Sequence, residues 1–311
     1  MTVDTNNEIF AQDAAFWQNY SKGRPQPPPS LFQRIYDYHR QHHGQFGVVH
    51  DVGAGNGVYS RLLRSQFQHV IVSDVVPGNI QQAEKRLGMD GYTYREGKME
   101  EIRDITDGSV DLVIALNAIH WADQTAAMKT IAAQLKPGGT FAAATFGAAR
   151  FRDDRVQNVW DRIMTEGGRL LLKTAENRRD TINVMARSQD RYNVAPLDEG
   201  FQPGVRRIFL NMDRGGLTGI LPPENRGDVT DPDFTGPNDV LVDERDEEWR
   251  FELSLETFQE HFRSFPHAAR DPETFAPLWK EVEDLVRQGH RLDGYWPVAL
   301  ILATRNIDKV L

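Results

Sequence analysis

A β-branched run that stops in closely spaced glycines is the feature that most constrains the fold of this chain. Residues 48–52 read Val-Val-His-Asp-Val, and glycine then stands at positions 53, 55 and 57, where a helical pattern begins. Glycine carries no side chain, so the backbone can turn tightly there and approach a ligand closely. The pattern predicts a strand, a ligand-binding loop and a helix in direct succession.

Asp51, near the end of that strand, distinguishes this loop from the sequence fingerprint of dinucleotide-binding folds. That fingerprint reads G-x-G-x-x-G and sets a diphosphate over a helix N-terminus, whereas this loop reads D-x-G-x-G-x-G. A carboxylate would repel a diphosphate, but it would attract an ammonium or a sulfonium group. S-Adenosylmethionine carries both of these groups. The loop therefore argues against a nicotinamide oxidoreductase.

Three later segments strengthen this interpretation. A second β-rich run ends in Asp74, whose carboxylate can accept hydrogen bonds from both hydroxyls of a ribose. The other two are residues 92–121, a loop followed by an apolar strand, and the Leu-Lys-Pro-Gly-Gly sequence that begins at residue 135. In this order the segments resemble the class I S-adenosylmethionine-dependent methyltransferases, over residues 46–147.

The resemblance implies that S-adenosylmethionine is the cofactor and that the loops at the strand ends hold it. Lys98 stands where this family often has an aspartate that accepts from the adenine amino group, and a lysine cannot accept a hydrogen bond. We therefore expect the Met99 backbone or Glu100 to recognise adenine. The implied cofactor-binding residues are Tyr20, Arg24, Asp51, Gly53, Ala54, Gly55, Asn56, Gly57, Asp74, Val75, Met99, Glu100 and Asn117.

The N-terminal region points to a subgroup. Residues 16–25 read F-W-Q-N-Y-S-K-G-R-P and resemble the Y-x-x-x-R-P-x-Y-P opening of the trans-aconitate methyltransferase-like group, which acts on small molecules. Pro27-Pro28 replaces the second Tyr-Pro of that opening, while the His120-Trp121 pair is typical of the group. The resemblance implies an N-terminal lid with Tyr20 and Arg24, and it favours methylation of a carboxylate.

Few side chains are candidates for catalysis. His120 is a candidate general base at the end of the fourth predicted strand, and its alternative is a structural histidine bonded to the chain. Arg24 could grip an anionic acceptor through two parallel hydrogen bonds. The predicted substrate pocket consists of Tyr20, His120 and Trp121. The cluster His39, His42 and His43 suits the end of a helix better than a metal site.

Alternating strand and helix patterns predict an α/β, doubly wound (Rossmann-like) fold. By resemblance we expect a seven-stranded, mostly parallel sheet with an antiparallel last strand. Amphipathic helical patterns over residues 156–172 and 174–187 predict a helical cap insertion after the fifth strand. The sixth strand could come from residues 205–212 or 249–253. The predicted divisions are a lid and lead-in helix (1–43), the core (44–147 and part of 200–311), the cap (148–198 and about 254–290) and an acidic loop (226–248).

Composition excludes several functional classes. The chain has no cysteine, so thiolate nucleophiles, disulfides and cysteine metal sites are absent. A net charge of −9 argues against nucleic-acid binding, and nine acids against one arginine in residues 228–248 suggest a solvated loop. Apolar runs are too short to span a bilayer, and the acidic start does not resemble a signal peptide. We expect a cytoplasmic monomer or homodimer with a small-molecule acceptor and no membrane partner.

Two alternatives to carboxylate methylation stay open. The first is an O-, N- or S-methyltransferase of a secondary metabolite, because acceptor sites diverge while cofactor motifs persist. The second is a non-methylating protein on the same fold, such as a cofactor-bound cyclase or a binding module.

Overall fold

An eight-stranded sheet, in the order β3-β2-β1-β4-β5-β11-β7-β8, forms the centre of the computed structural model. The structure describes residues 14–101, 105–197, 200–268 and 271–307. All strands run in one direction except β11, which lies antiparallel between β5 and β7. The strands are β1 (Val48–Val52), β2 (His69–Asp74), β3 (Tyr92–Glu96), β4 (Val110–Leu116), β5 (Leu135–Phe146), β7 (Arg206–Leu210), β8 (Val240–Glu244) and β11 (Val298–Thr304).

The strand order reverses at β1, which pairs with β2 on one side and β4 on the other. Every residue of β4 is buried, as expected for a central parallel strand that is covered on both faces. In open sheets of this kind, ligands bind outside the carboxyl ends of the strands at the point of reversal. The fold thus places the loops after β1, β2 and β4 around one crevice.

Helices cover both faces of the sheet. Residues of α3, α4 and α5 share one hydrophobic cluster with one face of the sheet, and residues of α6 share another cluster with the opposite face. Proline begins α3 and α5, where its missing N–H costs nothing. The four helices are α3 (Pro29–Gln41), α4 (Ser60–Arg64), α5 (Pro77–Leu87) and α6 (Gln124–Gln134).

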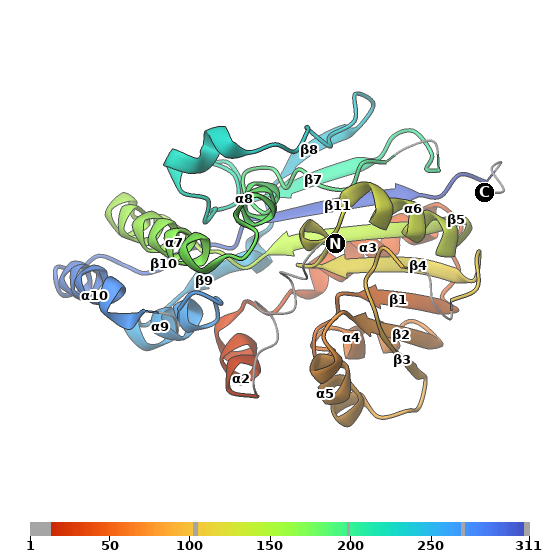
Figure 1. The fold of residues 1–311 in the computed structure, drawn as a ribbon, viewed down its shortest axis with the longest axis horizontal. Coiled ribbons are helices and arrows are strands. Elements are labelled where there is room, and N and C mark those ends of the chain that lie inside the picture. Colours follow the sequence, from red (N-terminus) through yellow and green to blue (C-terminus); the bar gives the residue numbers. More distant parts are fainter. Residues whose placement is uncertain (1–13, 102–104, 198–199, 269–270, 308–311) are drawn as a thin grey trace.

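A second group of helices lies beyond the ends to which the arrows of β4 and β5 point (Figure 1). Aspartate, asparagine or serine caps the N-terminus of each cap helix. The cap helices are α7 (Asp154–Thr174), α8 (Arg178–Arg187), α9 (Leu255–Arg263) and α10 (Pro272–Arg287). The N-terminal helix α2 (Ala14–Gly23) packs on α9, where the backbone oxygen of Gly23 meets the ring of His261 at 2.9 Å.

The structure differs from the sequence prediction at one edge of the sheet. The predicted seven strands are present, but an eighth, β8, pairs with β7 from within the segment predicted to be an acidic loop. Two features explain β8: its β-branched Val240 and Val242, and a buried ion pair between Arg207 and Asp239 just before it.

Residues 205–212 supply the sixth strand of the predicted sheet as β7. Residues 249–253 instead supply β9 (Arg250–Glu252), which belongs to a small separate sheet with β10 (Asp293–Tyr295) and β6 (Arg150–Phe151). Within the described ranges, no helix is long and apolar enough to cross a bilayer.

Candidate functional site

A cavity of about 540 Å³ lies at the carboxyl ends of β1, β2 and β4, within the range usual for small-molecule sites. The loops of the sheet, the lid helix α2 and the cap helix α8 all contribute to its wall. The predicted residues on that wall are Tyr20, Asp51, Gly53, Ala54, Gly55, Asp74, Val75, Met99, Glu100, Asn117 and Trp121. The other predicted residues, Arg24, Asn56, Gly57 and His120, do not line it.

The three glycines of the loop have positive φ values but different neighbours. A Cβ on Gly53 would lie 2.6 Å from the Cβ of Ala118, and one on Gly55 would lie 2.6 Å from the ring of Trp17. A Cβ on Gly57 would instead meet the side chain of Leu87 in α5, at 2.7 Å. Gly53 and Gly55 therefore permit the close packing of the cavity wall, whereas Gly57 permits a helix to pack.

Asp74 is the most highly bonded carboxylate of the cavity. Its Oδ2 accepts the backbone N–H of Gly55 at 2.8 Å, and its Oδ1 accepts from the backbone N–H of Val76 and from Asn79 Nδ2 at 2.9 and 3.1 Å. Asn79 Oδ1 in turn accepts from Trp17 Nε1 at 2.9 Å. One hydrogen-bond network thus joins the acid after β2, the glycine loop and the lid helix.

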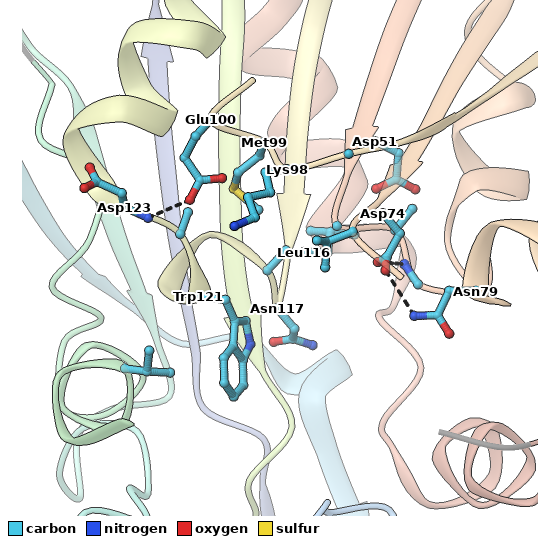
Figure 2. Close-up of a pocket in the computed structure, with 18 of the residues that line it drawn as sticks. Asp51, Asp74, Asn79, Lys98, Met99, Glu100, Leu116, Asn117, Trp121 and Asp123 are labelled. Atoms are coloured by element: carbon cyan, nitrogen blue, oxygen red, sulfur yellow. Dashed lines mark hydrogen bonds between the residues drawn. The ribbon is translucent and has the colours of Figure 1, made fainter. Parts of the chain in front are cut away.

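Asp51 lies deeper, with 2% of its surface exposed. Ser60 Oγ donates to its Oδ2 at 2.6 Å. Burial raises the pKa of Asp51 to about 7; the Ser60 bond opposes this rise, and the charge of Asp74 adds to it. Figure 2 shows both acids on the same side of the cavity. Two carboxylates so close favour a cationic ligand.

The loop after β3 faces these acids from the opposite side of the cavity (Figure 2). Glu100 Oε1 accepts the backbone N–H of Asp123 at 2.8 Å, so the carboxylate is partly engaged by the start of α6. Met99 packs near Gly53, where its Cε would lie 3.6 Å from an added Cβ. Asn117, at the end of β4, has a φ of 54°, and its Oδ1 accepts from the backbone N–H of Phe146 at 2.9 Å.

His120 is buried behind the cavity wall rather than on it. Its Nδ1 lies 3.2 Å from the hydroxyl of Tyr192, and its backbone oxygen accepts from Arg187. Burial, with the nearby charges of Arg187 and Arg24, lowers the pKa of His120 to about 3. The imidazole is therefore uncharged at any physiological pH.

Arg24 lies beside the cavity, next to wall residue Tyr20. Its guanidinium carbon is 3.9 Å from the ring centre of Phe265 and 5.3 Å from that of Tyr20, both within range of cation–π attraction. Burial lowers the pKa of Arg24. Its Nε is buried without an acceptor, and none of the carboxylates in the described ranges forms an ion pair with it.

Sequence reasoning predicted a substrate cap but did not identify the cap residues that line the cavity. Asp180, Val184 and Arg187 line the cavity from α8, and their spacing of four and three residues puts them on one helical face. That spacing could have identified the face, but not the surface against which it packs. Trp17 and Asn79 were missed too, although Trp17 lies inside the N-terminal motif.

The histidines near residue 40 have structural contacts. His39 Nδ1 meets Thr140 Oγ1 at 2.7 Å, and its Nε2 meets the backbone oxygen of Gln45 at 2.8 Å. Throughout the part of the chain that the structure describes, no group of three His, Asp or Glu side chains is placed to hold a metal ion.

Known methyltransferases resemble this chain in sequence and in fold. Residues 50–143 match the family model for a methyltransferase domain. The chain is 65% identical over 306 residues to Methyltransferase gedG of Aspergillus terreus, covering 98% of this chain and 96% of the relative. It is 59% identical over 305 residues to Methyltransferase tpcM of Aspergillus fumigatus, covering 98% and 96%. The solved structure of a putative type II methyltransferase from Anaeromyxobacter dehalogenans aligns with a TM-score of 0.57 and 21% identity, over 90% of this chain and 97% of that one, and shares the fold.

Proposed function

Because the chain belongs to the class I S-adenosylmethionine-dependent methyltransferases, we propose that it methylates a carboxylate of a small organic molecule. The observation that carries this assignment is Arg24, a guanidinium enclosed by Tyr20 and Phe265 without a carboxylate partner in the described ranges. The side chain is partly exposed, and its Nε is buried without an acceptor. An anionic ligand would offset the cost of removing this part of the guanidinium from water.

We propose one orientation for the cofactor in the cavity. We assign the ammonium of the methionine moiety to Asp51 and the ribose hydroxyls to Asp74, with the glycine loop along the chain between them. Adenine then lies between Val75 and the loop at Met99 and Glu100. The supporting observation is that all five residues or their loops line one cavity, with the two acids on one side and the adenine loop on the other (Figure 2).

S-Adenosylmethionine supplies an electrophilic methyl group, so the protein has mainly to align the acceptor and exclude water. Alignment of this kind can supply about 7–11 kcal/mol of a barrier. An ionised carboxylate needs no base, and a guanidinium can hold both of its oxygens in a fixed plane. Arg24 would then orient the acceptor, while Tyr20 and Trp121 enclose it.

Membership of the trans-aconitate methyltransferase-like group is part of the same proposal. It is supported by the N-terminal motif, because Tyr20 lies on the cavity wall and Arg24 lies directly beside it.

Methylation of a hydroxyl, amine or thiol of a secondary metabolite is the second candidate. The observation in its favour is the uncharged state of His120, whose lowered pKa leaves the imidazole free to accept a proton at neutral pH. A base with so low a pKa is weak, however. We therefore rank this function below carboxylate methylation.

Substitution of Arg24 tests the assignment. The variant Arg24→Gln should reduce transfer of label from methyl-labelled S-adenosylmethionine into a metabolite extract by about tenfold or more, because it removes a charged bidentate contact. The matched control Arg162→Gln changes an exposed cap arginine that pairs with Glu281 and should leave transfer unchanged. Equal transfer by Arg24→Gln, with the fold retained, would contradict the anionic acceptor.

A further inference from the structure

We propose that Asp231, outside the residues that line the cavity, is a positioning residue that sets the cavity wall through Arg187. It belongs to the acidic segment of residues 228–248, to which the sequence assigned no function. The inference rests on methyl transfer in this cavity, but it does not require the acceptor to be a carboxylate.

Arg187 is the link between the acidic segment and the wall. It lines the cavity at the end of α8, and its Nη1 donates to the backbone oxygens of His120 at 3.0 Å and Ala122 at 2.9 Å. Those two carbonyls flank Trp121, in the short helix η1 (Ile119–Trp121). A single guanidinium therefore bonds to both sides of Trp121. Figure 2 shows the ring of Trp121 at the cavity.

Asp231 fixes the orientation of that guanidinium. Its carboxylate forms an ion pair with Arg187 Nε, and the two side chains are only 19% and 13% exposed. The donors of a guanidinium form a rigid planar fork, so anchoring Nε also determines where Nη1 points. Without Asp231, the donor to the two carbonyls would lose its alignment.

Neutral contacts hold the acidic segment against α8 independently of this ion pair. The backbone N–H of Thr230 donates to Asn183 Oδ1, and Asn183 Nδ2 donates to Thr230 Oγ1, both at 3.0 Å. Further along, the backbone N–H of Phe234 donates to Asn193 Oδ1 at 2.6 Å. Loss of the Asp231 charge should therefore misalign Arg187 without releasing the segment.

The short helix η1 also has supports of its own. Gln124 Nε2 donates to the backbone oxygens of Ile119 at 2.7 Å and Ala122 at 3.0 Å. The hydroxyl of Tyr192 meets His120 Nδ1 at 3.2 Å. These contacts keep the turn folded, so the expected effect of changing Asp231 is a displacement of the wall rather than local unfolding.

Two variants distinguish a positioning role of Asp231 from a purely structural link between α8 and the acidic segment. Asp231→Asn removes the charge, and the double variant Arg187→Asp with Asp231→Arg rebuilds an ion pair between α8 and the acidic segment. An aspartate at position 187 has no donor for the carbonyls of His120 and Ala122. The swap should thus restore the link between α8 and the acidic segment but not the alignment of η1. Glu224→Gln is the control, since it breaks only an exposed pair with Arg169.

The readouts are melting temperature, calorimetric affinity for S-adenosylhomocysteine, and methyl transfer from labelled S-adenosylmethionine into a fixed metabolite extract. Asp231→Asn should lower transfer by about tenfold to a hundredfold, as a displacement of about 1 Å can do, and leave S-adenosylhomocysteine affinity unchanged. The swap should have the melting temperature of the parent but should not regain its methyl transfer. Glu224→Gln should match the parent in all three measurements.

Recovery of methyl transfer by the swap would overturn the proposal, because the ion pair would then only link α8 to the acidic segment. Unchanged transfer in Asp231→Asn would overturn it too. A methylated product that is not an ester, with the same dependence on Asp231, would contradict the carboxylate assignment and leave the positioning role standing.

Discussion

If the buried carboxyl of Asp51 holds the ammonium of the cofactor, as proposed, cofactor binding should be sensitive to pH. Its pKa is raised to about 7, so the group is largely protonated and neutral below pH 7 in the free protein. A cationic ligand favours the ionised form and must displace that proton. Affinity for S-adenosylmethionine should therefore rise by up to about tenfold per pH unit between pH 5 and 7 and level off above.

Calorimetry in buffers of different ionisation enthalpy measures this directly, since binding below pH 7 should release a proton. The variant Asp51→Asn has no carboxyl to ionise and should bind weakly with a flatter pH dependence. A parent affinity that is constant from pH 5 to 8 would rule out Asp51 as the ammonium partner.

His120 gives a second pH prediction at the residue scale. With its pKa lowered to about 3, it stays neutral from pH 5 to 9 and can produce no inflection in turnover near its usual value of about 6.5. If the acceptor is already ionised, His120→Ala should lower turnover by less than about tenfold, against the 10²–10⁴ that a general base contributes. Turnover that collapses and recovers as pH rises would instead indicate a protonated acceptor.

At the scale of the element, the glycine loop allows a paired test of where the cofactor lies. Gly55 and Gly57 both have positive φ, so alanine at either position strains the backbone by about 1–2 kcal/mol. Of these two glycines, Gly55 alone lines the cavity, and a Cβ added there would also press on Trp17. Gly55→Ala should weaken binding of S-adenosylhomocysteine by about tenfold or more, a loss of about 1.4 kcal/mol.

Gly57→Ala is the matched control, because its Cβ would meet Leu87 and Ala83 in α5 instead. It should lower the melting temperature as Gly55→Ala does while leaving the affinity close to that of the parent. Equal loss of affinity in both variants would mean that loop strain, rather than proximity to the ligand, explains the effect.

The elements that the sequence predicted well are those with strong local patterns. Apolar runs bounded by glycine and acids identified β1, β2, β4 and β5, and the helical spacing of α7 predicted a cap helix. β8 was missed because its short apolar run lies among acids, and its partner, β7, is far away in the sequence. Pairing over such distances leaves no local periodicity to detect.

The same limit applies to the site. Asp51, Asp74 and Gly55 could be predicted to line the cavity because acids and glycines at the ends of parallel strands point to a ligand site. The cavity face of α8, with Asp180, Val184 and Arg187, could not, because periodicity defines a helix face but not its packing partner. Arg24 was placed from a motif, and the structure adds that aromatic rings enclose it and that no carboxylate in the described ranges pairs with it.

At the scale of the whole molecule, two acids line the cavity and a cation lies beside it. Asp51 and Asp74 lie on the sheet side, and Arg24 lies between the lid and α9, next to Phe265. A cationic methyl donor and an anionic acceptor would each be held by the opposite charge. Methyl transfer removes the carboxylate charge of the acceptor, so the contact with Arg24 should weaken in the product state, whereas the ammonium assigned to Asp51 keeps its charge.

The chemical nature of the methylated product tests this account most directly. Purified protein is incubated with methyl-labelled S-adenosylmethionine and a metabolite extract, and the labelled product is isolated and treated with mild alkali. A methyl ester of a small carboxylic acid is predicted, and alkali should release the label as methanol. A product that keeps its label through the same treatment, as a methyl ether, amine or thioether would, contradicts carboxylate methylation and favours the hydroxyl, amine or thiol acceptor.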